Sequence, residues 1–120
     1  MPFQYLLTNL LVDVPGAHGA IFLDPEGECV EVVSRQATPY ELKLEGAYHG
    51  IFLRQAARLA SISGAGDLER LVIAGRQMAV MSIVLKEGYY LVLIMESGTP
   101  ASVAAGAMRR TAEALNREIP

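Results

Sequence analysis

The chain has 120 residues, of which 52% are hydrophobic, and its formal net charge at pH 7 is -3. This length predicts one domain, residues 1–120, which can bury about two thirds of the surface that its unfolded chain exposes. The acidic balance and the lack of a basic stripe argue against a nucleic-acid partner. The hydrophobic share is slightly high for a soluble domain, which indicates an interface with another chain.

Cys29 is the single cysteine, so the chain has no internal disulfide and no CxxC pair, which fits a reducing compartment. The opening residues MPFQYLLTNLLVDVPG carry no basic segment, and polar side chains interrupt their apolar run. They predict neither a signal peptide nor a membrane span. We therefore expect a cytoplasmic protein without membrane insertion.

The first element is a helix with one apolar stripe at helical spacing. That stripe consists of Phe3, Leu6, Leu7, Leu10, Leu11 and Val14. Pro15 and Gly16 end the helix. Residues 17–23 and 29–34 then form two strands of a hairpin, because Asp24-Pro25-Glu26-Gly27 between them has turn chemistry.

A long middle helix is predicted next, from Thr38-Pro39 to about Ser63. Thr38 can cap it, Pro39 suits the first helical position, and Glu41 completes a capping box. The sequence Ser-Gly-Ala-Gly stops it.

Three strands follow, at residues 68–75, 78–86 and 89–95, and their short connections require antiparallel neighbours. Thr99-Pro100 repeats the cap-then-proline signal, and a last helix runs from Pro100 to about Glu118. Both faces of the later strands are apolar, so helices must cover both sides of the sheet. The prediction is an α+β fold of order αββαβββα. It has a five-stranded antiparallel sheet, the long helix on one face and the two terminal helices on the other.

The middle helix carries two separate apolar strips. The strip expected to face the sheet consists of Leu42, Gly46, Leu53, Ala56, Ala57, Leu59 and Ala60. A polar strip separates it from a second apolar strip of Leu44, Tyr48, Ile51 and Ile62. A monomer leaves this second strip exposed, and such a patch usually marks a partner surface.

The third strand, LERLVIAG, lies at a sheet edge if the chain order is followed outward, and its centre carries no charge. An uncharged apolar edge invites pairing with another chain, and a twofold homodimer is the commonest symmetric solution. The residues expected at this interface are Leu68, Leu71, Val72 and Ile73 of the strand, with Gly46, Gly50 and Leu53 of the middle helix.

The segment LLTNLLVDVPGAHGAIFLDPEGECVEVVS resembles the opening of roadblock/dynein light-chain domains, including the bacterial MglB-like regulators. The resemblance rests on a leucine-rich first helix, the Val14-Pro15-Gly16 turn, a hairpin of pattern GAxxxDxxG from Gly19 to Gly27, and a long second helix. It extends in element order over essentially the whole chain. These residues serve turns and packing, so they indicate the fold more than the activity.

The resemblance implies a homodimer with a continuous sheet through the third strands, whose paired middle helices present a platform to a Ras-like small GTPase. It implies a regulator or scaffold and no enzymatic site. The residues expected to contact the GTPase are Lys43, Leu44, Tyr48, Ile51, Arg54, Gln55, Arg58 and Ile62. The sequence leaves open whether the protein stimulates hydrolysis, promotes nucleotide exchange or only tethers its partner.

Other chemistries have little support. Cys29 with His49 lacks the orienting acid of a catalytic trio. His18 with His49 lacks metal-ligand spacing, and Gly16-Ala17-His18-Gly19 precedes a strand, whereas phosphate loops follow one. We expect no cofactor and no metal. Two alternative functions remain: a small-molecule sensor with PAS-like or profilin-like anatomy, and an inert structural subunit of a larger complex.

Overall fold

The computed structural model describes the backbone of residues 2–35 and 39–120, and the side chains of residues 3–35 and 50–120. Thr38, the predicted helix cap, lies outside this part. The elements in chain order are α1 (Pro2–Asp13), β1 (Ala17–Leu23), β2 (Cys29–Ser34), α2 (Pro39–Ile62), β3 (Arg70–Ala74), β4 (Met78–Val84), a short 3-10 turn η1 (Lys86–Gly88), β5 (Tyr90–Glu96) and α3 (Ala101–Glu118). This order confirms the predicted αββαβββα arrangement.

The sheet has five antiparallel strands in the order β2-β1-β5-β4-β3, so the first and last strands of the sheet are β2 and β3. β3 is shorter than predicted at both ends, and β4 stops at Val84. β4 ends there because the chain turns back through Glu87 and Gly88, which both have positive φ, and the Leu85 amide donates to the Tyr89 carbonyl at 2.7 Å.

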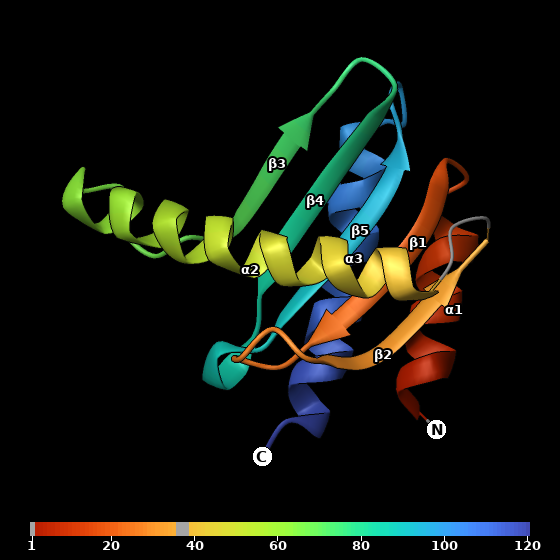
Figure 1. Cartoon of the computed structure of the whole chain (residues 1–120), viewed down its shortest axis with the longest axis horizontal. Coiled ribbons are helices and arrows are strands. Elements are labelled where there is room, and N and C mark those ends of the chain that lie inside the picture. Colours follow the sequence, from red (N-terminus) through yellow and green to blue (C-terminus); the bar gives the residue numbers. More distant parts are fainter. Residues whose placement is uncertain (1, 36–38) are drawn as a thin grey trace.

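Helices cover both faces of this sheet, as the sequence predicts: α2 crosses one face, while α1 and α3 pack side by side on the other (Figure 1). Each face has its own buried cluster. Leu10, Leu93 and Met108 belong to the cluster under α1 and α3. Ile21, Leu53 and Val92 belong to the cluster under α2.

The second half of α2 extends past β3 and beyond the sheet (Figure 1). Leu53 is only 4% exposed, and Ala56, Ala57 and Ala60 are half-buried, as expected for the sheet-facing strip. Leu59 was predicted to face the sheet, but it is 67% exposed. It follows Leu53 by six residues, which at about 100° per residue turns it about 120° away from the sheet.

A close approach between Gly50 and Tyr90 holds α2 against the sheet. Gly50 is buried, and a Cβ at this position would lie 2.2 Å from the Tyr90 hydroxyl oxygen. Tyr90 itself is 3% exposed. Burial raises the pKa of its hydroxyl above the ordinary value, while the nearby Arg54 guanidinium acts in the opposite direction. Because a Cβ at position 50 would clash with the Tyr90 hydroxyl, only glycine lets the backbone of α2 pass this close to the ring.

Replacing Gly50 with alanine should destabilise the fold. Overpacking a buried site costs about 1–3 kcal/mol, and the higher helix propensity of alanine offsets up to about 1 kcal/mol of that. The matched control is Gly106→Ala in α3, where a Cβ has its nearest neighbour 3.5 Å away, at the Arg110 side chain. We expect urea midpoints to fall for Gly50→Ala and to rise for Gly106→Ala at equal protein concentration. Equal midpoints for the two variants would refute the close packing.

Candidate functional site

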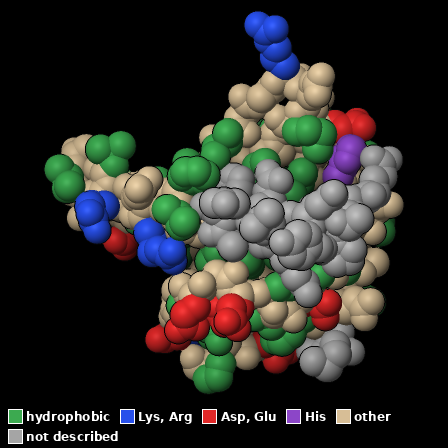
Figure 2. All heavy atoms as spheres, in the orientation of Figure 1, with side chains coloured by type: hydrophobic (Ala, Val, Ile, Leu, Met, Phe, Trp, Pro, Cys, Tyr) green, Lys and Arg blue, Asp and Glu red, His purple; other side chains and the backbone are tan. Residues whose placement is uncertain are grey.

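The outer face of α2 is apolar at its exposed end. Exposed large apolar side chains there are Ile51, Phe52, Leu59 and Ile62. Figure 2 shows hydrophobic side chains along this projecting end and beside it over the neighbouring strand. By helical spacing Ile51, Gln55, Arg58 and Ile62 lie on one strip, directly opposite Leu53. The structure therefore confirms that Ile51 and Ile62 share an exposed strip, and it adds Leu59 and Phe52 at its flank.

The basic side chains expected on this surface differ in their contacts. Arg54 is exposed, but its Nη1 donates to the Pro25 carbonyl at 3.2 Å, so it ties α2 to the β1–β2 turn. Arg58 is exposed and makes no ion pair with another described residue. Arg58 is therefore the more available cation for a partner. The structure does not describe the side chains of Lys43, Leu44 and Tyr48, nor the contacts around Gly46.

β3 presents an open edge next to the projecting helix. The Gly75 amide donates to the Met78 carbonyl at 2.8 Å, across the turn to β4. Along an antiparallel strand at a sheet edge, the N–H and C=O groups of successive residues point alternately inward, toward the neighbouring strand, and outward, away from it. The N–H and C=O groups of Arg70, Val72 and Ala74 therefore point away from β4, toward an edge where the described residues place no further strand.

The opposite edge, β2, is partly closed by its own side chain. The Glu31 Oε1 atom accepts a hydrogen bond from the Val32 amide at 3.1 Å. The Arg35 amide donates inward to the His18 carbonyl, so by the same alternation the Val32 amide is one that points outward. A charged side chain on an outward amide discourages another strand from pairing there. The two edges therefore differ: β2 is blocked and β3 is open.

The residues expected at a self-association interface are not all available for it. Val72 and Ile73 are exposed on β3, and Leu68 and Leu71 are half-buried. Val72 pairs with Met81, on the α1–α3 face, whereas Leu71 and Ile73 lie on the α2 face. Gly50 and Leu53 are already buried against the chain's own sheet, so we leave them out of the interface proposed below.

No arrangement for chemistry is found in the described part of the chain. Among those residues, His, Cys, Asp and Glu side chains nowhere gather in threes that could hold a metal ion. The His18 ring contacts the Glu96 carboxylate at 3.2 Å, and the His49 side chain lies outside the description. Within the described residues, no helix combines the length and apolar character that a membrane span needs.

Sequence reasoning missed two features of this region. The block on β2 depends on which amides point outward, and that is known only once the strand register is known. Leu59 could have been found, since it lies three residues before Ile62 at helical spacing.

The sequence itself matches no protein-family model and no curated protein. Several solved structures match closely in shape. An MglB with a tetrameric arrangement has a TM-score of 0.87 at 21% identity, covering 97% of this chain and 86% of that one. MglB of Myxococcus xanthus has a TM-score of 0.87 at 13% identity, covering 98% and 94%. A Roadblock/LC7 domain from Streptomyces avermitilis has 0.83 at 19% identity, covering 95% and 94%.

These likenesses extend over nearly the whole chain. The chain therefore has the roadblock/LC7 fold, the fold that it shares with MglB, as the resemblance in its sequence predicts.

Proposed function

We propose that the chain forms a twofold homodimer through β3 and that the paired α2 helices dock a Ras-like small GTPase. In this role it is a cytoplasmic regulator or adaptor and not an enzyme. The observation that carries the proposal is the position of the open β3 edge directly beside the overhanging apolar end of α2.

The open edge defines a register for self-pairing. Outward backbone groups occur at Arg70, Val72 and Ala74, and Val72 is the middle residue of β3. A twofold antiparallel pairing that uses all three sets Val72 opposite Val72 of the second copy, and Arg70 opposite the partner's Ala74. The two sheets then become one continuous sheet, with both α2 helices on the same face.

This pairing also places a second sheet beneath the projecting half of α2. Each α2 passes beyond its own β3, so in the pair its second half lies over the sheet of the other copy. The side of the helix that faces inward there carries Ala56, Ala57 and Ala60, which are small enough for close approach. The outward strip with Ile51, Arg58 and Ile62 stays accessible in the dimer.

A GTPase is the partner that the sequence resemblance implies, and the exposed strip suits a protein surface. It combines apolar anchors with one available guanidinium, the mixture that is common in the centres of protein interfaces. The resemblance implies that any effect on GTP hydrolysis comes from reshaping the GTPase.

A charge on β3 should prevent self-association. In the proposed register Val72→Lys places two ammonium groups side by side across the twofold axis, so we expect sedimentation at the 12.9 kDa monomer mass. The matched control is Val30→Lys on β2, which is 40% exposed against 47% for Val72 and should remain dimeric. Circular dichroism checks that both variants fold. A dimeric Val72→Lys protein, or a monomeric Val30→Lys protein, would contradict pairing through β3.

Aspartate on the outward strip of α2 should abolish GTPase docking and leave the dimer intact. The variants are Ile51→Asp and Ile62→Asp, and the control is Val12→Asp on α1, whose exposure of 68% is close to the 77% of Ile62. Binding is measured by biolayer interferometry with the Ras-like GTPase encoded nearest to this gene, loaded with GDP or a non-hydrolysable GTP analogue.

We expect at least a tenfold loss of affinity for each α2 variant and wild-type affinity for Val12→Asp. Hydrolysis and exchange rates of the same GTPase, with and without this protein, separate a regulator from a simple tether. Wild-type binding by both α2 variants would show that α2 is not the docking surface.

A further inference from the structure

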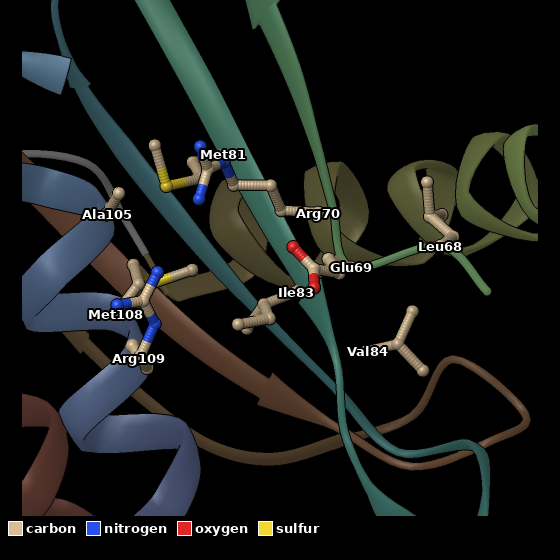
Figure 3. Close-up of a pocket in the computed structure, with 9 residues that line it drawn as sticks. All are labelled: Leu68, Glu69, Arg70, Met81, Ile83, Val84, Ala105, Met108 and Arg109. Atoms are coloured by element: carbon tan, nitrogen blue, oxygen red, sulfur yellow. The ribbon is translucent and has the colours of Figure 1, made fainter. Parts of the chain in front are cut away.

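A groove of about 450 Å³ lies on the face of the sheet opposite α2, between α3 and the strands β3 and β4 (Figure 3). Its apolar lining includes Met81 and Ile83 from β4 and Met108 from α3. Met81 and Met108 are buried and Ile83 is half-buried, so they form the floor. The groove opens to solvent, because Arg70, Arg109 and Glu69 at its rim are all exposed.

The groove exists because α3 does not reach the last strand of the sheet. Residues on this face of β3 and β4 are defined by the register, which pairs Arg70 with Ile83 and Val72 with Met81. The α3 residues that line the groove include the small Ala105, and the neighbouring position is Gly106. Ile83 of β4 therefore remains only half-buried beside the open edge, while Met81 is buried.

Two guanidinium groups reach this groove from opposite walls, Arg70 from β3 and Arg109 from α3 (Figure 3). Neither makes an ion pair or hydrogen bond with another described residue. Other arginines have such partners: Arg110 approaches Asp13 at 3.9 Å, and Arg35 donates to the carbonyls of Pro15 and Ala17. The rim has one carboxylate, Glu69, against two cations, so the groove is locally basic in a chain of net charge -3.

We propose that this groove docks a peptide segment of a partner that presents aliphatic side chains flanked by carboxylates. The aliphatic groups would fill the hollow over Met81 and Met108, and the carboxylates would pair with Arg70 and Arg109. Guanidinium groups favour carboxylates because they offer paired donors in one plane. A surface groove with charges on both rims suits a peptide, whereas an acyl chain is best held in a deep enclosed channel.

The groove is complete within one copy, but it also adjoins the self-pairing edge of the proposed function. If Arg70 pairs opposite the partner's Ala74, the β3–β4 turn of the second copy comes beside the groove and brings the partner's Arg76 toward it. The dimer would thus carry two such basic grooves flanking its twofold axis, on the face opposite the paired α2 helices. A GTPase and an acidic peptide could then bind at the same time.

The test uses protein labelled with ¹³C at its methionine methyl groups and a synthetic peptide of alternating glutamate and leucine pairs. We expect titration to shift the Met81 and Met108 signals and to leave Met78, which lies on the α2 face, unchanged. The same peptide with glutamine in place of glutamate should bind at least tenfold more weakly, because it lacks the charge that the guanidinium groups recognise.

Charge reversal tests the two arginines directly. The double variant Arg70→Glu with Arg109→Glu should weaken peptide binding at least tenfold, while Arg117→Glu, at the exposed end of α3, should bind as the wild type does. A parallel titration with decanoate tests whether a lipid-like molecule binds in the groove instead of a peptide. The proposal is overturned if Met81 and Met108 do not shift, if the glutamine peptide binds equally, if the double variant binds normally, or if decanoate saturates the groove and the peptide does not.

The outcome is separable from that of the proposed function. A protein that is dimeric and docks the GTPase but gives no methionine shift refutes only the groove. Wild-type protein diluted until it is monomeric should still bind the peptide, because Arg70, Arg109 and the apolar floor belong to a single chain. Loss of the dimer with retained peptide binding would therefore leave the groove standing by itself.

Discussion

Unpaired backbone groups on the outer side of β3 are the constraint on which the proposed role of this domain depends. An exposed strand with free N–H and C=O groups is a template for another strand, and proteins usually block such edges with charges, bulges or covering elements. Here β2 has such a block, since the Glu31 carboxylate occupies the outward Val32 amide. β3 has an apolar centre instead, with Val72 and Ile73 exposed. This asymmetry favours a closed pair over an open chain of sheets.

The length of α2, whose second half projects beyond the sheet, fits the same self-pairing. A helix that ended at the edge of its own sheet would bury its inner face within one copy. α2 continues further, and past Leu53 its inner side carries only alanines that are half-buried in the single chain. A second sheet continuing from β3 would lie under these alanines, and Ile51, Arg58 and Ile62 would stay on the outside. In the proposed dimer, the pairing edge would thus determine which surface is left for a third protein.

Much of this architecture could be predicted from residue patterns. Helical spacing in residues 3–14, turn chemistry at Asp24–Gly27 and the short connections between the later strands predict the element order, and the apolar character of both sheet faces predicts the two helical layers. Leu59 was placed wrongly because an apolar residue was assumed to face the sheet, although its angular position on the helix points elsewhere. The need for glycine at position 50 could not be predicted, because it arises from a contact with Tyr90, which is distant in sequence.

The features that sequence patterns could not predict arise from segments brought together only by folding. The groove under β3 combines residues from 68–70, 81–84 and 105–109, and no local spacing links them.

Hydrogen exchange at the Val72 amide, followed as a function of protein concentration, distinguishes a β3 edge that pairs with a second copy from one that stays exposed to solvent. This amide points away from β4, and in a single copy no described residue accepts a hydrogen bond from it. Pairing through β3 predicts strong protection of the Val72 amide at high protein concentration that is lost on dilution, while the inward Ile73 amide stays protected throughout. Rapid exchange of the Val72 amide at every concentration at which the protein is folded would contradict pairing through β3.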